Sequence, residues 1–476
     1  MRTIGTPSTQ ARKLNAIASG ALPNGDPVVV NADGTVSVVS ETAISVSLGN
    51  STQFESSDAY HIASAFDSAA GKVVVAYRDA GNSNRGKGIV GTVSGSSISF
   101  GSEATFNTSE TNWCHVVYDE NAEKCVITFR GTSSYLTGVV ATVSGTSISF
   151  GTAVVIASVG GSGQSACYDS VSQKIIATTG NNAYVGTVSG TSISFGSANS
   201  FNSGANISVA SSYDSAAQKL IVSYRDIDNS HSGRAKVGTV SGNSISFGSS
   251  VVFDSSAVNY VASTYDSSAQ KIVIGFSDQA GGAAPGLGKI IVGNVSGTSI
   301  SFGSSINMTG NTSYMNEVIY DPTSNKIVAV TSSTGGTGDY VVATVSGTSI
   351  TKDSSSAVDS YAIGYMGLAI DSTNNKVVFS YSSYSGGDGG VSKVFQPAYN
   401  ATTLTAENYI GLASNGYPDT AGATIDVQGA INDRQSGLTA GQSYYVQTDG
   451  TLTTTAGDPS VFAGTAISAT KMIVKG

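Results

Sequence analysis

Short runs of aliphatic residues, separated by polar residues and glycine, recur along the whole chain. In TVSGTSISFG, residues 142–151, valine and isoleucine alternate with serine and threonine on both sides of a glycine. Alternation with a period of two predicts β-strands, and glycine at the first central position of a two-residue loop favours a type II′ hairpin turn. This register would place Val143 opposite Ile148 as a cross-strand pair. The pattern therefore predicts an all-β protein assembled from hairpins.

Two markers of this kind repeat along the chain. The hairpin glycine occurs six times, and an aromatic or aliphatic residue followed by Asp, four residues and Lys occurs seven times. The marker aspartates follow one another in steps of 45 to 55 residues, and each step holds four short strand patterns. Such a period predicts a β-propeller of four-stranded blades. The hairpin glycines are Gly95, Gly145, Gly190, Gly242, Gly297 and Gly347; the marker pairs are Asp67/Lys72, Asp119/Lys124, Asp169/Lys174, Asp214/Lys219, Asp266/Lys271, Asp321/Lys326 and Asp371/Lys376.

The seventh repeat has three strand patterns and lacks the hairpin that would supply its outer strand. A matching pattern, ETAISVSLGN, lies at residues 41–50, ahead of the first repeat. We expect this segment to become the outer strand of the last blade, because such a clasp removes the two open edges of the array. The prediction is a seven-bladed β-propeller of four-stranded blades over residues 41–402, closed by an N-terminal strand.

Residues 1–40 and 403–476 fall outside the repeats and contain an internal echo. GDPVVVNADGTVS, residues 25–37, parallels GQSYYVQTDGTLT, residues 441–453. Each copy reads as a strand, an Asp-Gly turn and a second strand. Because a closed propeller brings the two chain ends together, we expect both segments to form one small β-domain.

Composition and charge exclude several classes of partner. The net charge is −9 and no cluster of lysine and arginine is present, so nucleic acid is not an expected partner. No apolar run approaches the ~20 residues of a membrane-spanning helix, and the first residues lack the apolar segment of a signal peptide. Cys114, Cys125 and Cys167 lack metal-type spacing and are expected to be buried free thiols, which suits folding in a reducing cytoplasm.

Candidate catalytic and metal-binding residues are few. The sequence has three histidines and no metalloprotease, phosphate-loop or nucleophile-elbow motif, so we expect neither enzyme activity nor a cofactor. His61 and His115 occupy adjacent positions in inner strands, where they are expected to be polar residues tolerated near a wet channel. Asp226 and Asp228 alternate in RDIDNSHSG as in a calcium-binding loop but lack its acidic closing residue, so a solvated turn is favoured over a metal site.

The loops between second and third strands carry the variation in length between repeats, as in RDAGNSNRGKG and SDQAGGAAPGLGK. Variable loops on a rigid scaffold commonly carry binding residues. Aromatic residues six or seven positions before the marker aspartate would lie at the inner rim of this loop face and could stack on sugar rings. The alternative is that these rings fill space between inner strands. The predicted binding set is Tyr60, Trp113, Tyr260, Tyr314 and Tyr365, with polar partners Arg78, Asp79, Asn84, Arg225, Asp226 and Asp278.

Both chain ends resemble a known class of module. ASGALPNGDPVVVNADGTVSVV near the start, and GLTAGQSYYVQTDGTL with VFAGTAISATKMIVKG at the end, are similar to small β-modules of tailed-bacteriophage virion proteins. Tail fibres and capsid-decoration proteins carry such segments. The resemblance covers about 110 residues, and the repeats lack the Gly-Gly and Trp-Asp signatures of kelch and WD-type propellers.

The resemblance implies a structural protein of the virion, assembled in the host cytoplasm. Its terminal β-domain would attach to other virion proteins, and its loop face would bind a glycan or protein on the host surface, as in a tail fibre. A capsid-decoration protein without a specific receptor is the first alternative, and a glycan-cleaving propeller is a weaker one because no facing pair of carboxylates is evident. A secreted bacterial lectin is disfavoured by the missing signal peptide. A homo-oligomer stays open, although no coiled-coil heptad is present to enforce one.

Overall fold

The computed structural model describes residues 12–158, 163–204, 206–279, 286–333, 337–384 and 389–475. They belong to two compact units: a repeat unit, Ser45–Pro397, and a terminal unit made of Met1–Ile44 and Ala398–Gly476. The sequence placed these boundaries at 40/41 and 402/403. Within the described residues, the only helical segments are two short 3-10 turns, η1 (Ala80–Asn82) and η2 (Thr132–Ser134). The prediction of an all-β protein is confirmed.

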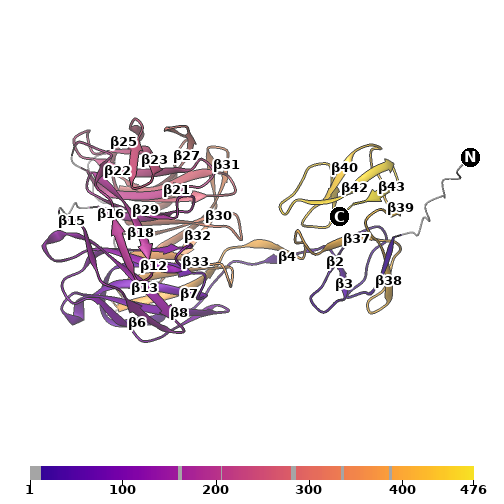
Figure 1. Cartoon of the computed structure of the whole chain (residues 1–476), viewed down its shortest axis with the longest axis horizontal. Coiled ribbons are helices and arrows are strands. Elements are labelled where there is room, and N and C mark those ends of the chain that lie inside the picture. Colours follow the sequence, from indigo (N-terminus) through magenta and orange to yellow (C-terminus); the bar gives the residue numbers. More distant parts are fainter. Residues whose placement is uncertain are drawn as a thin grey trace, which may run out of the picture. The chain divides into compact units, whose positions relative to one another are not determined.

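Within the described residues, the repeat unit contains seven successive groups of antiparallel strands. Figure 1 shows that this unit is built from strands. In every group the first, inner strand ends at the marker aspartate and the second begins at the marker lysine. The inner strands are β6 (Thr52–Asp67), β11 (Asn112–Asp119), β16 (Gln164–Asp169), β21 (Asn206–Asp214), β25 (Val251–Asp266), β29 (Ile306–Asp321) and β33 (Ile363–Asp371). The second strands are β7 (Lys72–Asp79), β12 (Lys124–Arg130), β17 (Lys174–Thr179), β22 (Lys219–Asp226), β26 (Lys271–Asp278), β30 (Lys326–Ser333) and β34 (Lys376–Ser383).

The third strand of each group pairs with the second and carries the outer hairpin. The third strands are β8 (Arg85–Ser94), β13 (Leu136–Ser144), β18 (Asn182–Ser189), β23 (Ser232–Ser241), β27 (Gly286–Ser296), β31 (Asp339–Ser346) and β35 (Gly389–Gln396). The outer strands are β9 (Ser97–Phe100), β14 (Ser147–Phe150), β19 (Ser192–Phe195), β24 (Ser244–Phe247), β28 (Ser299–Phe302) and β32 (Ser349–Ala357). Three groups add a short second outer piece, namely β10 (Ala104–Asn107), β15 (Val154–Ala157) and β20 (Asn199–Ser200).

The marker turn repeats because its chemistry is local. The carboxylate of Asp67 accepts a hydrogen bond from the backbone N–H of Ala70 at 2.9 Å, and Asp119 accepts one from Ala122 at 2.9 Å. The residue before the marker lysine has a positive φ in all seven copies, from 64° at Gly71 down to 53° at Glu123 and Asn325. An aspartate that satisfies turn N–H groups and a residue in the left-handed region together close the first hairpin of each group.

The decapeptide hairpin has the predicted register. Val143 pairs with Ile148, and Gly145 has φ 61° at the turn. The glycine that ends the decapeptide explains why the motif is preserved. A Cβ added at Gly151 would lie 1.8 Å from the carbonyl oxygen of Thr191, in the hairpin turn of the following group. Successive groups therefore touch through backbone at a position where no side chain fits.

The segment expected to form the closing strand divides into two parts, which corrects the predicted boundaries of 41–50. β4 (Glu41–Ile44) pairs with β36 (Tyr399–Thr402) in a separate two-stranded ribbon. β5 (Ser47–Leu48) and the first part of β6 pair with β35 of the seventh group instead. The reason is register: the backbone N–H of Gly49 donates to the carbonyl of Val394 at 2.8 Å, as the glycine of each outer hairpin does in its own group.

The hydrophobic core of the repeat unit lies between adjacent groups of strands. Aliphatic residues of the second and third strands are buried on both faces, as expected for sheets packed face to face. One core cluster joins the first group to the seventh: it contains Ile62 and Val73 from β6 and β7, and Val378 and Val394 from β34 and β35. The first and last repeats of the sequence therefore pack against each other.

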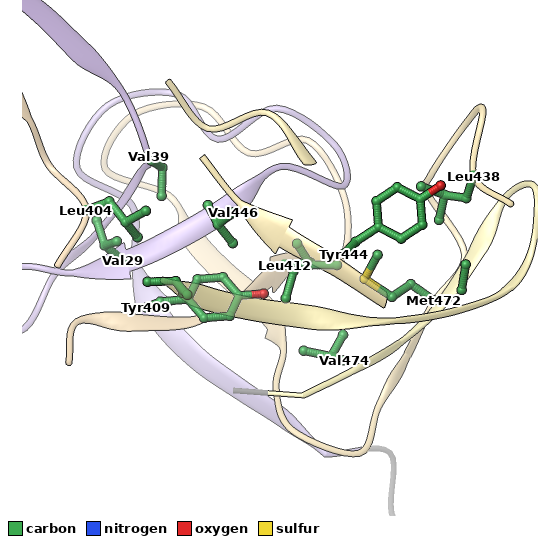
Figure 2. Close-up of a cluster of buried hydrophobic side chains, with 13 residues drawn as sticks. Val29, Val39, Leu404, Tyr409, Leu412, Leu438, Tyr444, Val446, Met472 and Val474 are labelled. Carbon is green, nitrogen blue, oxygen red and sulfur yellow. The ribbon is translucent and has the colours of Figure 1, made fainter. Parts of the chain in front are cut away.

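The terminal unit contains two five-stranded sheets with the same strand order. The first has the order β1-β38-β37-β2-β3 and the second β39-β43-β42-β40-β41. In Figure 2, apolar side chains from both sheets, including Tyr409, Leu412, Tyr444, Val446 and Met472, meet in one buried cluster. The first sheet comprises β1 (Lys13–Ile17), β2 (Pro27–Val30), β3 (Val36–Val38), β37 (Tyr409–Ala413) and β38 (Gly422–Asp426). The second comprises β39 (Ile431–Asn432), β40 (Ser443–Val446), β41 (Leu452–Thr453), β42 (Val461–Ser468) and β43 (Lys471–Val474).

The echo noticed in the sequence marks equivalent hairpins of these two sheets. The backbone N–H of Asn31 donates to Thr35 at 2.8 Å, and that of Gln447 donates to Thr451 at 2.8 Å. The two sheets are thus copies of one module. In the sequence, the repeat unit is inserted between β3 and β37, the third and fourth strands of the first copy. Segments from both ends of the chain contribute to this unit. No described helix has the length and apolar character that crossing a bilayer requires.

Candidate functional site

One cavity of about 350 Å³ is lined by residues of all seven inner strands, together with Gly163, which directly precedes β16. We call it the inner-strand cavity. Its wall includes His61 from β6, Trp113 from β11, Tyr260 from β25 and Tyr365 from β33. The sequence dictates this convergence, because these four residues each stand six positions before a marker aspartate.

Each of these positions is a β-bulge with unusual backbone geometry. The inner strand shifts register at this point in six of the seven groups. His61, Trp113, Ser208, Tyr260 and Tyr365 have φ values of 50°, 53°, 51°, 49° and 45°. A bulky residue at positive φ costs on the order of 1–3 kcal/mol, and such strain clusters at binding and active sites. Bulges also re-aim side chains, and here they bring these five into a single cavity.

The rings at the rim of the cavity contact one another edge to face or tilted. The centroid of His61 lies 5.0 Å from that of Trp113 and 4.8 Å from that of Tyr365. Trp113 lines the cavity, and 37% of its surface is exposed. A partly exposed indole beside tyrosine rings offers the flat apolar faces on which sugar rings stack.

The predicted aromatic set is only partly brought together. Trp113, Tyr260 and Tyr365 line the cavity. Tyr60, one position earlier than the bulge, does not line it; its ring packs 5.1 Å from Tyr365 and lies under the guanidinium of Arg78 at 5.0 Å. Tyr314 is 42% exposed and also lies outside the lining. The spacing of six rather than seven residues separates the two sets, because only the bulged residue is turned inward.

Three of the predicted polar partners lie near the rim without lining the cavity. Arg78 donates through Nη1 to Asn112 Oδ1 at 2.6 Å, and Arg225 Nη2 lies 3.1 Å from His231 Nδ1. Asn84 has φ 59° and its backbone carbonyl accepts a hydrogen bond at 3.0 Å. The arginines are in a position to act on a ligand at the mouth, whereas Asn84 shapes a turn.

The three predicted aspartates are engaged in buried ion pairs. Asp79, Asp226 and Asp278 are 4%, 3% and 8% exposed. Asp226 lies 3.1 Å from Arg234 Nε, and Asp278 lies 2.6 Å from the ammonium group of a lysine on the third strand. Burying an ion pair requires both partners, so these carboxylates serve the fold and are not presented to a ligand on the loop face. This corrects the role that the sequence assigned to them.

The weak calcium loop is not assembled by the structure. Asp226 is held by Arg234 and by the side-chain amide of Asn229 at 2.8 Å. Among the described residues, Asp226 and Asp228 belong to no group of three ligands close enough to hold a cation. Cys114, Cys125 and Cys167 are free, as predicted; the first two are buried, whereas Cys167 is partly exposed and departs from the prediction.

Sequence reasoning missed Glu317 and Gln164 in the cavity, whereas it had placed His115 near the channel. Glu317, four positions before its marker aspartate, lines the cavity, and burial raises the pKa of its carboxyl to about 8. His115, at the equivalent position of another repeat, is a neutral imidazole because burial lowers its pKa to about 4. Gln164 is 4% exposed, and neither atom of its amide has a hydrogen-bond partner within the part of the chain that the structure describes. For Glu317, the available signal was the four-residue spacing to the marker aspartate that it shares with His115.

A second polar cluster lies apart from the aromatic cavity. The carboxylates of Glu55, Asp79 and Glu103 lie within 4.8 Å of one another. Lys87 pairs with Asp79 at 4.0 Å and with Glu103, and the Tyr77 hydroxyl lies 2.8 Å from Glu103 and 3.3 Å from Glu55. Because Glu55 belongs to the segment that pairs with β35, this cluster ties that segment to the first group of strands.

No model of a known protein family matches the chain, and no curated protein matches it in sequence. Solved structures do show its fold. The chain is similar to the β-propeller domain of Cps50 (Swd1) from Myceliophteria thermophila, with 8% identity, a TM-score of 0.50, and coverage of 72% of this chain and 99% of that one. A chain of the Mitotic Checkpoint Complex matches with 10% identity and a TM-score of 0.47, covering 74% of this chain and 96% of its own. The match to the Cps50 domain shows that the fold is a β-propeller.

Proposed function

We propose that the chain is a structural protein of a tailed-bacteriophage virion that adsorbs to a glycan on the host surface through the inner-strand cavity. The observation that carries the binding part is the set of five strained side chains that five of the repeats direct into one cavity. Side chains held in unfavourable backbone conformations are retained when function requires their position. The resemblance of both chain ends to phage virion modules supports the virion part, with the terminal unit as the attachment to other virion proteins.

We also infer the finer architecture of the propeller, namely seven blades in a closed ring. Three contacts support closure. The segment containing Gly49 pairs with the seventh group, a Cβ on Gly49 would lie 1.9 Å from the carbonyl of Ser96 in the first hairpin, and Glu55 hydrogen-bonds to groups of the first repeat. The convergence of all seven repeats on one cavity supports the same arrangement. A closed ring would hold the cavity residues on a rigid frame, which favours preorganised binding.

Binding would be non-covalent. The cavity offers aromatic faces, an amide and a carboxyl, but among its described lining residues Glu317 is the single carboxylic acid. Glycoside hydrolysis in most families needs two carboxyl groups about 5–9 Å apart across the scissile bond. The inner-strand cavity therefore favours a receptor-binding function over glycan cleavage.

A glycan array tests the proposal directly. The full-length chain is compared with Trp113→Ala and with Tyr135→Ala, which removes an equally exposed ring (36%) that does not line the cavity. We expect selective binding that Trp113→Ala weakens at least about tenfold, since stacking on an aromatic face is worth on the order of 1 kcal/mol or more. Tyr135→Ala should bind as the unaltered chain does. Absence of binding to any glycan would favour a capsid-decoration role, which localisation in the particle would then test.

A further inference from the structure

The mouth of the inner-strand cavity carries positive charge in a chain that is acidic overall. Arg78, Arg130 and Arg225 stand at the ends of second strands, and no carboxylate of a described residue lies within 4.0 Å of any of their guanidinium groups. Arg78 and Arg130 help to lower the pKa of His61 to about 3, after the larger effect of its burial. The part of this depression that comes from the arginines has the sign of a positive potential beside His61, because like charge disfavours the imidazolium.

The acidic groups near these arginines are few. Asp58 accepts the hydroxyl of Tyr60 at 3.0 Å, and Glu110 accepts the amide of Asn112 at 3.1 Å. Both belong to loops or strand segments at the rim, and neither forms an ion pair with an arginine. In addition, the Nε–H groups of Arg78 and Arg225 are buried and have no acceptor among the residues that the structure describes. A buried donor without a partner costs free energy, so a ligand that supplies an acceptor there would bind more tightly.

The floor of the cavity is polar and uncharged at neutral pH. The Glu317 carboxyl has no hydrogen-bond partner among the described residues, and desolvation alone raises its pKa. It faces the cavity together with the unpartnered amide of Gln164 and the neutral imidazole of His115. A carboxylic acid in its protonated form is a hydrogen-bond donor, so the floor can donate to oxygen atoms without adding negative charge.

We propose that the inner-strand cavity binds a sugar bearing one negative group, a carboxylate or a phosphate, which the rim arginines attract while protonated Glu317 donates to the ligand from the floor. The inference rests on the proposed function and names its ligand class. It also makes binding depend on the protonation of a single residue. Ionised Glu317 would lose its donor and repel the anion.

The other groups that face the cavity do not titrate with Glu317. His61 and His115 lose their protons far below neutral pH, and burial raises the pKa of the Cys114 thiol to about 12. Burial also raises the pKa of the Tyr260 phenol above its usual value. With a pKa of about 8, Glu317 is about nine-tenths protonated at pH 7 and about one-tenth protonated at pH 9. Affinity that requires the acid form should therefore fall about tenfold between these pH values.

The experiment is a glycan array that carries uronic-acid, sialic-acid and phosphate-bearing glycans beside neutral and amino-bearing ones, read with the full-length chain at pH 7 and pH 9. We expect the bound glycans to be acidic and their affinity to fall about tenfold at pH 9. Glu317→Gln keeps the donor and cannot ionise, so it should bind equally at both pH values. Arg78→Gln and Arg225→Gln should each weaken binding about tenfold, consistent with loss of a charge-assisted contact. Lys72→Gln makes the same charge change in a marker turn and should have no effect.

The outcomes separate this inference from the proposed function. Selective binding of neutral or amino-bearing glycans would overturn the anionic class and leave a glycan-binding cavity standing. Acidic glycans bound with equal affinity at pH 7 and pH 9 would remove Glu317 from the mechanism. If no glycan binds, both proposals fail together. If an arginine variant does not fold, as judged by its melting curve, the pH profiles of the unaltered chain and of Glu317→Gln still test whether protonated Glu317 is needed for binding.

Discussion

A single methyl group at Gly49 tests whether the propeller is closed by its N-terminal segment. An added Cβ would lie 1.9 Å from the carbonyl oxygen of Ser96 and 3.4 Å from that of Val394. The first atom belongs to the hairpin turn of the first repeat, and the second to the last repeat. Both are backbone atoms, so neither can rotate away as a flexible side chain would. Gly49→Ala must therefore push the closing segment away from one end of the array.

The magnitude follows from two contributions. Overpacking a close backbone contact costs about 1–3 kcal/mol. Displacing the segment also weakens the hydrogen bond from the Gly49 N–H to Val394 at 2.8 Å, worth about 1 kcal/mol. We expect Gly49→Ala to lower the free energy of unfolding by about 2–4 kcal/mol. Gly101→Ala, whose Cβ would lie 1.9 Å from the carbonyl of Thr146, should lose a similar amount.

Urea unfolding, followed by circular dichroism, compares these variants with a control. Gly95→Ala also replaces a repeat-unit glycine, but it has φ 60° and nothing within 4 Å of the added Cβ. Its cost should be the left-handed backbone alone, about 1 kcal/mol. If Gly49→Ala is no less stable than the unaltered chain while Gly101→Ala is strongly destabilised, the N-terminal segment does not close the ring and the reasoning is refuted.

Three further predictions concern stability. The carboxyl of Glu317 has a pKa of about 8 in the folded protein and of 4.5 when exposed, so the free energy of unfolding falls as pH rises between these values. Glu317→Gln should therefore be as stable as the unaltered chain near pH 4.5 and more stable by about 3–5 kcal/mol at pH 8. Thermal melting across pH measures the difference. Arg234→Met should cost about 3–5 kcal/mol in urea because it strands buried Asp226, and adding Asp226→Asn should restore much of the loss. Because the Thr403 N–H donates to the Ser40 carbonyl at 3.0 Å, replacing residues 41–402 with Gly-Gly should leave a terminal unit that gives a β-type circular dichroism spectrum and unfolds cooperatively.

The strands of the repeat unit were predictable because their boundaries are set by neighbouring residues. The aspartate of each marker ends one strand and the lysine begins the next, and the aspartate accepts turn hydrogen bonds from a residue three positions later. The cross-strand pair Val143 and Ile148 follows from a two-residue turn in the same way. Turns of this kind can be predicted from a few neighbouring residues, and the marker turn recurs in all seven repeats.

The pairing of residues 47–48 was harder to predict because their partner strand is distant in the sequence. Residues Ser47 and Leu48 pair with β35, almost 350 positions later in the chain, and the alternating pattern alone does not specify where that pairing starts. The same alternation allowed Glu41–Ile44 to be assigned to the propeller, although these residues pair with Tyr399–Thr402. Long-range register depends on packing and not on local propensity.

The candidate site was half predictable for a related reason. Trp113, Tyr260 and Tyr365 were found as rings at a fixed distance from a marker, but the bulge that turns the residue six positions before the aspartate inward was not anticipated. Once a bulge shifts the register, the alternation of faces reverses. His61 and Glu317 were consequently left out of the binding set, while Asp79 was included although a lysine of the adjacent strand pairs with it.

The central claim, that the inner-strand cavity is the binding site, can be measured with the chain's own fluorophore. Trp113 is the only tryptophan of the sequence and is 37% exposed at the cavity. Quenching of its emission by acrylamide is recorded with and without a glycan chosen from the array, with Tyr135→Ala as a matched variant. The account predicts that saturating glycan shields Trp113 and lowers the quenching constant severalfold in both proteins. Glycan binding that leaves the quenching of Trp113 unchanged would place the binding site elsewhere and contradict it.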